Sequence, residues 1–157
     1  MRKKIKPYII SVLIALAAGG ISALLTMNNM DLYSRIEPPL APPPWLFPVV
    51  WSILYILMGI GAALVYNRKD FKHEETKRAL TLYAVNLALN FFWSIIFFNF
   101  DAYLFAFLWL VLLWLVIIAM IISFRRVSTV AGYLQIPYLL WVTFAGYLNF
   151  AICLLNK

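Results

Sequence analysis

Long stretches without any charged residue constrain the fold of this chain more than any other feature of its sequence. Five windows contain no Asp, Glu, Lys or Arg, and each is 22 to 30 residues long: 7–30, 38–67, 79–100, 102–124 and 127–156. A helix of about 20 mostly apolar residues crosses the hydrocarbon core of a bilayer, and it satisfies its own backbone hydrogen bonds there. The windows therefore predict an all-α membrane protein built as a five-transmembrane-helix bundle.

We expect a single transmembrane domain that covers residues 1–157. Its helices are predicted at about 7–26, 44–67, 79–100, 103–124 and 128–155, with a proline-rich loop at 27–43. Pro137 lies inside the last helix and removes one backbone donor, which predicts a kink. Ala15, Gly19 and Ala23 give the first helix a face of small residues, which lets helices approach closely in lipid. That face suits packing within the chain or against a second copy.

The composition excludes several other classes of protein. Apolar residues make up 65% of the chain and charged residues 12%, whereas a soluble domain is about 45–50% apolar and about 25% charged. A disordered chain is poor in apolar residues, and a transmembrane β-barrel has shorter, alternating segments. A cleaved signal peptide is a competing interpretation of the first window, but the apolar run continues to Leu25, beyond the usual length.

The positions of the basic residues predict an orientation in the membrane. The net charge of +7 is also typical of nucleic-acid binding, but the distribution of the charges argues against that function. The amino-terminal tail and the second and fourth loops hold eleven of the 13 Lys and Arg residues. Cytoplasmic loops are enriched in these residues, so we expect a cytoplasmic amino terminus and a carboxyl terminus on the opposite side. The lipid bilayer is a predicted partner of the chain, and no nucleic acid is expected.

The windows carry aromatic and amide side chains but no ionisable carboxylate, Lys, Arg or His. Those on stripes expected to face inward are Trp51, Tyr55, Asn86, Asn90, Trp93, Trp141 and Asn149. Ion and proton pathways normally need ionisable groups at depth, which disfavours a pump, a proton-coupled transporter and an ion channel. Ligand pockets are mostly apolar and aromatic with a few polar groups. The pattern therefore suits a large, flat, apolar ligand, and packing between helices is the alternative explanation.

A metal site is not expected from this sequence. His73 is the only histidine and lies in a charged loop, and Cys153 is the only cysteine. Histidine and cysteine are the usual ligands of zinc in proteins, and one chain cannot supply a cluster of them.

Three ordered blocks of the sequence carry a resemblance to a known family. The first is Pro38-Pro39-Leu40-Ala41-Pro42-Pro43-Pro44-Trp45-Leu46-Phe47-Pro48-Val49-Val50-Trp51, the second Leu89-Asn90-Phe91-Phe92-Trp93-Ser94, and the third Pro137-Tyr138-Leu139-Leu140-Trp141-Val142-Thr143-Phe144-Ala145 with Leu148-Asn149. These blocks resemble the motifs of the TspO/MBR family of tryptophan-rich sensory proteins, over nearly the whole chain. The resemblance implies a five-helix fold in the bacterial cell membrane, usually dimeric, that binds porphyrins and synthetic isoquinoline or benzodiazepine ligands.

The resemblance also implies which residues form the site. The ligand-binding positions it indicates, together with the inward stripe, are Pro42, Pro43, Trp51, Tyr55, Asn90, Trp93, Trp141, Ala145 and Asn149. Trp51 and Trp141 match tryptophans that are linked in some bacterial members to light-dependent porphyrin breakdown. Leu40 stands where many members have an aromatic residue, and the cholesterol motif that animal members carry after the last helix is missing.

One principal hypothesis and three alternatives follow. The principal hypothesis is a homodimeric membrane protein that binds or senses tetrapyrroles, with a protoporphyrin IX-like ligand held in the aromatic pocket under the proline-rich loop. No cofactor is required for that role. The alternatives are an enzyme that degrades porphyrin in light through Trp51 and Trp141, a passive transporter of porphyrin or lipid-like molecules, and a purely structural assembly factor.

Overall fold

The chain folds into a bundle of long helices, and no strand occurs in the described part of it. The computed structural model describes residues 2–26, 40, 43, 45–70, 72–100 and 102–155, with side chains from Ile5 onward. The helices are α1 (Arg2–Thr26), α3 (Leu46–Tyr66), α4 (His73–Ser94), the π-helical turn η2 (Ile95–Asn99), α5 (Tyr103–Val127), α6 (Thr129–Tyr133) and α7 (Ile136–Leu155). Five helical segments are long and apolar enough to cross a membrane, which confirms the predicted fold class.

Two helices begin earlier than the sequence predicted, and these bounds need correction. α1 begins at Arg2 rather than at 7, and α4 begins at His73 rather than at 79. Charged residues end a window that lipid can cover, but they do not end a helix that continues into water. Glu74 and Glu75 lie in the first turn of α4, where the helix dipole favours negative charge.

The last membrane segment is interrupted rather than simply kinked. α6 ends at Tyr133, and α7 begins at Ile136 with Pro137 as its second residue. Proline lacks the N–H that would continue a helix through this point, but it is well tolerated in a first turn. Gln135, at the break, is fully buried and donates to the carbonyl oxygen of Leu57 in α3 at 3.2 Å. The break therefore also joins two helices.

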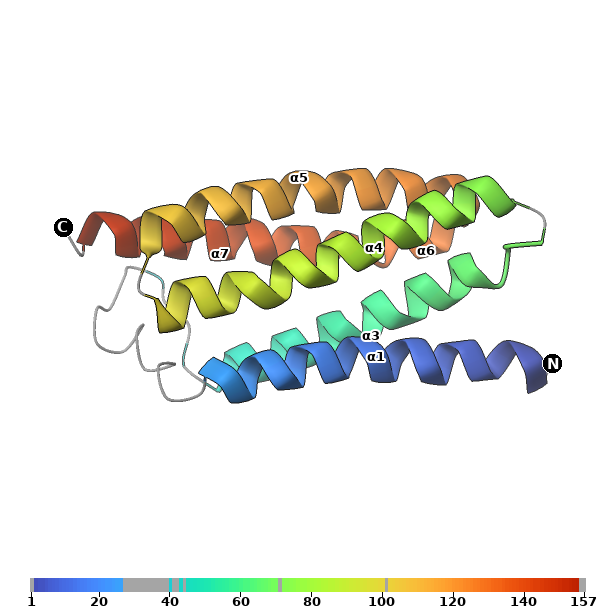
Figure 1. Cartoon of the computed structure of the whole chain (residues 1–157), viewed down its shortest axis with the longest axis horizontal. Coiled ribbons are helices and arrows are strands. Elements are labelled where there is room, and N and C mark those ends of the chain that lie inside the picture. The colour runs from blue at the N-terminus through green and yellow to red at the C-terminus, as the bar shows by residue number, and fades with distance from the viewer. Residues whose placement is uncertain are drawn as a thin grey trace.

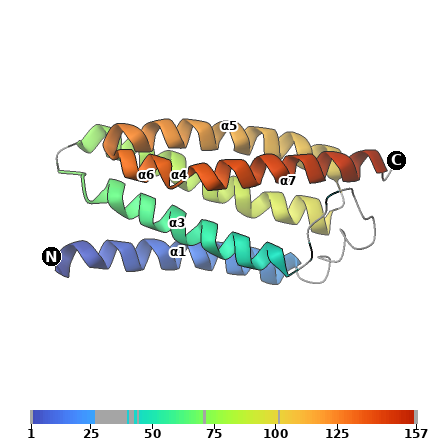
Figure 2. The ribbon, with the colours of Figure 1, turned by 180° about the vertical axis from the view of Figure 1, so that it is seen from behind.

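The helices lie roughly parallel or antiparallel along one long axis (Figures 1 and 2). α1 and α3 lie side by side, and α4 lies between this pair and the pair formed by α5 and α7. The tight turn after η2 makes α4 and α5 antiparallel neighbours, as the sequence predicted.

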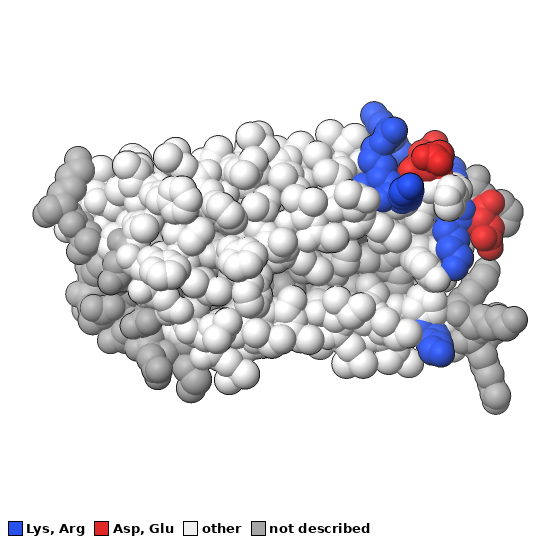
Figure 3. Space-filling model, viewed as in Figure 1, with Lys and Arg blue, Asp and Glu red and all other residues white. Residues whose placement is uncertain are grey.

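Charged side chains gather at one end of the bundle, where α1 begins (Figure 3). The charged residues whose side chains are described are Lys6, Arg68, Lys69, Asp70, Lys72, Glu74, Glu75, Lys77, Arg78, Arg125 and Arg126. The chain is thus an integral membrane protein in which the described charged side chains form one charged face at an end of the apolar body. The predicted cytoplasmic side corresponds to this face.

Glycines set the close approach of α1 and α3. A Cβ added at Gly59 would lie 2.5 Å from the Cα atom of Val12, and a Cβ added at Gly19 would overlap the ring of Tyr55. Ala15 on the same face is fully buried. Of the two uses that the sequence allowed for this face, packing within the chain is therefore present at Ala15 and Gly19.

The crossing gives a first testable prediction. Gly59→Ala forces α1 and α3 apart because the new methyl group meets backbone, and overpacking of this kind costs about 1–3 kcal/mol. We expect a lower midpoint of thermal unfolding in detergent. Gly20→Ala is the matched control, because a Cβ there meets nothing within 4 Å. Equal midpoints for the two variants would contradict the close crossing.

Candidate functional site

Five of the predicted ligand-binding residues meet at one cavity. The cavity has a volume of about 190 Å³ and lies at the end of the bundle opposite the charged face, where α1 ends and α3 begins. Its lining comes from α1, α3, α4, η2 and α7: Gly19, Ser22, Ala23, Thr26, Phe47, Pro48, Trp51, Tyr55, Trp93, Ser94, Phe98, Trp141, Ala145 and Leu148. Helices far apart in the sequence thus bring Trp51, Tyr55, Trp93, Trp141 and Ala145 together.

Aromatic rings form most of the wall. Trp51 stacks on Tyr55 with ring centroids 5.7 Å apart and planes inclined by 30°. On another side, Phe47 meets Trp141 edge-on at 5.9 Å. Such offset and edge-to-face pairs are the favoured arrangements of aromatic rings. They hold the ring faces in fixed directions, which suits a flat apolar ligand.

Asn90 lies behind the wall and not on it. Its amide is almost fully buried, accepts from the Tyr55 hydroxyl at 3.1 Å and donates to the Tyr138 hydroxyl at 2.8 Å. The Tyr138 hydroxyl in turn donates to Asn86 Oδ1 at 2.6 Å. Asn90 therefore orients the ring of Tyr55 from behind the wall, and its contact with a ligand stays a prediction.

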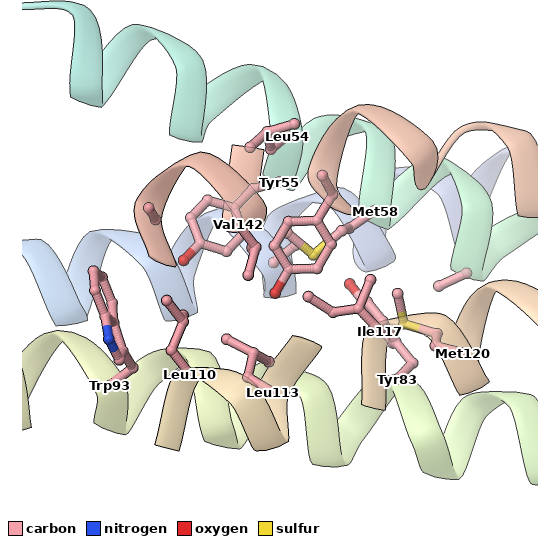
Figure 4. Close-up of a cluster of buried hydrophobic side chains, with 14 of the residues drawn as sticks. Leu54, Tyr55, Met58, Tyr83, Trp93, Leu110, Leu113, Ile117, Met120 and Val142 are labelled. Carbon is pink, nitrogen blue, oxygen red and sulfur yellow. The ribbon is translucent and has the colours of Figure 1, made fainter. Parts of the chain in front are cut away.

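Asn149 plays the same part for Trp93. The indole N–H of Trp93 donates to Asn149 Oδ1 at 3.1 Å, and the amide of Asn149 donates to the Tyr103 carbonyl oxygen at 2.9 Å. Asn149 is fully buried and does not line the cavity. Figure 4 shows Trp93 and Tyr55 within the surrounding cluster of buried side chains from α3, α4, α5 and α7. Both wall residues are thus fixed from behind by amides.

Trp141 differs from Trp93 because its indole N–H has no partner. The nitrogen is buried, and no acceptor among the described residues lies within hydrogen-bond reach. A buried donor without an acceptor costs about 1–3 kcal/mol. A ligand with a polar edge that enters the cavity can supply the missing acceptor.

The two predicted proline contacts are not part of the described wall. Pro42 lies outside the described residues. Pro43 is exposed, and its carbonyl oxygen accepts from the backbone N–H of Leu46 at 3.0 Å, at the start of α3. The described contact of Pro43 is therefore with the first residue of α3.

Several lining residues were not among the predicted site residues. Ser22 and Thr26 each follow a residue of the small-residue face of α1, Gly19 and Ala23, by three positions, and that spacing was visible in the sequence. Thr26 Oγ1 donates to the Ser22 carbonyl oxygen at 2.9 Å, so its hydroxyl has a hydrogen-bond partner within the same helix. Phe47 and Pro48 lie in the first family block, and their positions next to Trp51 could have indicated them.

The π-helical turn also shapes this end of the cavity. It follows Ser94 and contains Phe98, and both residues line the wall. Asn99, its last residue, donates to the carbonyl oxygen of Leu25 at 2.9 Å. Turns of this kind occur frequently at functional sites. Sequence periodicity gives no signal for them, which is why the turn was not predicted.

The chain is similar in sequence to several known proteins over most of its length. The model of the TspO/MBR family matches residues 11–155. The chain is 39% identical over 158 residues to the tryptophan-rich protein TspO of Chlorobaculum tepidum, covering 99% of both chains. It is 39% identical over 143 residues to the protein CrtK of Rhodobacter capsulatus, covering 91% of this chain and 89% of that protein. It is 37% identical over 114 residues to the translocator protein of Ovis aries, covering 73% and 68%.

The hydrogen bond between Tyr55 and Asn90 gives a second prediction. Tyr55→Phe keeps the ring and removes the donor, which leaves Asn90 Oδ1 unpaired, so we expect a loss of about 0.6–1.5 kcal/mol in unfolding free energy. Tyr133→Phe is the matched control because Tyr133 is exposed on α6. In a double-mutant cycle with Asn90→Leu, the two losses should not add. Additive losses would show that the two side chains do not interact.

Proposed function

The chain belongs to the TspO/MBR family, and from this we propose that it binds a tetrapyrrole of the protoporphyrin IX type in the aromatic cavity. One observation carries the proposal: Trp51, Trp93 and Trp141, from three different helices, line the same cavity, and the N–H of Trp141 has no acceptor there among the described residues. A macrocycle offers a flat π-face for the rings. Its polar edge offers an acceptor for the indole.

The size of the cavity limits how such a ligand would enter. Pockets for drug-sized ligands have volumes of about 300–1,000 Å³, and this cavity of about 190 Å³ is smaller. The proposal is therefore that one edge of the macrocycle inserts between Trp51 and Trp141, while the rest stays at the end of the bundle where the segment 27–44 connects α1 to α3. A binding or sensing role fits this arrangement, because none of the described lining residues is ionisable at neutral pH.

Light-dependent breakdown of the bound porphyrin is the second candidate function. The observation that favours it is the position of Trp51 and Trp141 on the wall, where their indoles would lie against the excited ring and could exchange electrons with it. Opening the ring is an oxidation, and dissolved dioxygen would be the oxidant that supplies the oxygen atoms of the product. This candidate requires a bilin-like product that forms only in light and only when both tryptophans are present. Porphyrin loss at the same rate without protein would exclude it.

The binding proposal is tested by titrating protoporphyrin IX into the purified protein in mild detergent. Tryptophan fluorescence should be quenched saturably, and the near-ultraviolet absorption band of the porphyrin should shift. Trp141→Phe keeps a ring but removes the N–H, so we expect about three- to tenfold weaker binding, the effect of one hydrogen bond. Combining it with Trp51→Phe should weaken binding further.

Trp114→Phe is the matched control for this titration. Trp114 lies on α5, outside the cavity, and donates to Thr143 Oγ1 at 2.9 Å. Its substitution should leave the affinity for porphyrin unchanged. If Trp114→Phe and the double variant of Trp51 and Trp141 bind porphyrin equally well, the ligand does not occupy this cavity.

A further inference from the structure

A second cavity lies at the charged end of the bundle, and the proposed porphyrin site makes no use of it. Its volume is about 750 Å³, and it lies between the start of α1, the end of α3 and the start of α4. The lining residues are Lys6, Pro7, Ile10, Ser11, Ile14, Ala62, Ala63, Tyr66, Asn67, Lys69, Asp70, Leu80 and Tyr83. None of them lines the aromatic cavity.

The lining divides into an apolar part and a charged rim. Ile10, Ile14 and Leu80 lie deeper within membrane-spanning segments, whereas Lys69 and Asp70 lie outside them and Lys6 is the second residue of the first one, at the charged face. Ile14 is eight residues beyond Lys6 on α1, about 12 Å along the helix at 1.5 Å per residue. The cavity thus runs from the charged face into the apolar body, as the shape of a lipid would require.

The rim is positively charged and has donors to spare. The lining contains two lysines, Lys6 and Lys69, and one carboxylate, that of Asp70. The ammonium of Lys69 donates to the Tyr66 hydroxyl at 2.6 Å and lies 4.0 Å from the ring centroid. The hydrogen bond to Tyr66 raises the pKa of Lys69, so this side chain is charged at neutral pH. An ammonium has three donors, so others remain for an anion.

The hydroxyl of Tyr83 is an independent observation in favour of a ligand in this cavity. The side chain is 8% exposed, and its hydroxyl is buried without a hydrogen-bond partner among the described residues. Ser11 is the described side chain whose hydroxyl interacts with that of Tyr83, but the pair falls short of the distance and angle of a full hydrogen bond. Ser11 is five residues beyond Lys6 on α1, or about 7 Å deeper. At this depth the Tyr83 hydroxyl can donate a hydrogen bond to an acceptor that lies just below the headgroup of a lipid.

We propose that this cavity binds one anionic phospholipid. Its phosphate lies at Lys6 and Lys69, an ester carbonyl accepts from the Tyr83 hydroxyl, and an acyl chain follows Ile10, Ile14 and Leu80. Basic pockets between transmembrane helices on the cytoplasmic side are typical sites for anionic headgroups, and the charged face is the side that the sequence predicts to be cytoplasmic. The occupant is a membrane lipid, because the apolar part of the cavity has no role in binding a free phosphate.

Native mass spectrometry of the delipidated protein tests the proposal. The probes are dioleoyl phosphatidylglycerol, dioleoyl phosphatidylcholine and inorganic phosphate. We expect one phosphatidylglycerol to bind at least about tenfold more tightly than phosphatidylcholine, from the contribution of the lysines at the rim. Equal retention of the two lipids, or displacement of phosphatidylglycerol by millimolar phosphate, would overturn the proposal.

Charge-matched variants locate the site. Lys6→Gln with Lys69→Gln should abolish the preference for phosphatidylglycerol. Lys77→Gln with Arg78→Gln removes the same charge from exposed positions of α4 outside the cavity, and it should retain the preference. If both double variants lose the preference equally, the lipid responds only to the overall charge of this face, and the cavity is not the site.

Tyr83→Phe separates a lipid contact from a structural role. It should weaken phosphatidylglycerol binding about threefold or more, the effect of one hydrogen bond. The midpoint of thermal unfolding of the delipidated variant should stay within about a degree of the parent chain's, because the hydroxyl makes only a weak contact with Ser11 inside the chain. A lower midpoint without lipid, or unchanged lipid binding, would contradict the assigned contact.

Discussion

The hydrogen bonds of Asn90 hold together the helices on which the rest of this structure depends. In lipid no hydrophobic driving force brings helices together, so packing and interhelical hydrogen bonds must do so. Asn90 on α4 contacts the hydroxyl of Tyr55 on α3 and that of Tyr138 on α7, and Asn149 on α7 accepts from Trp93 on α4. These bonds fix three helices around the aromatic cavity. The amides therefore stabilise the bundle and orient the wall of the pocket at the same time.

Much of this arrangement was predictable from the residues, because lipid penalises polar groups severely. The charge-free windows gave the five membrane segments, since a charge inside lipid is rare and costly. The same cost placed Asn86 and Asn90 in the interior, and both are buried. Trp51, Tyr55, Trp93, Trp141 and Ala145 converge as expected because aromatic and small residues on one stripe must share the face that the helix turns inward.

Other features were beyond prediction because they depend on partners that the sequence does not reveal. Asn90 and Asn149 were expected to contact a ligand. The sequence alone does not show that the amide of Asn90 is hydrogen-bonded to Tyr55 and that of Asn149 to Trp93. The helix starts at Arg2 and His73 were not predicted. A window without charges indicates which residues lipid can cover, but the helix can continue beyond the window into water. A full break before Pro137 was not predicted, and neither was the hydrogen bond that Gln135 makes there to Leu57 in α3, because the two residues are 78 positions apart.

The small residues on one face of α1 contribute both to helix packing and to the wall of the aromatic cavity. Gly19 has no side chain, so the ring of Tyr55 occupies the space where a Cβ would stand, and both residues then line the aromatic cavity. One turn before Gly19, Ala15 is fully buried against the bundle. A face that is filled in this way is not available to a second copy of the chain at these positions. Any homodimer of the kind that the family resemblance implies would therefore have to form through other surfaces, such as the exposed apolar side chains of α1 and α5 that face the lipid.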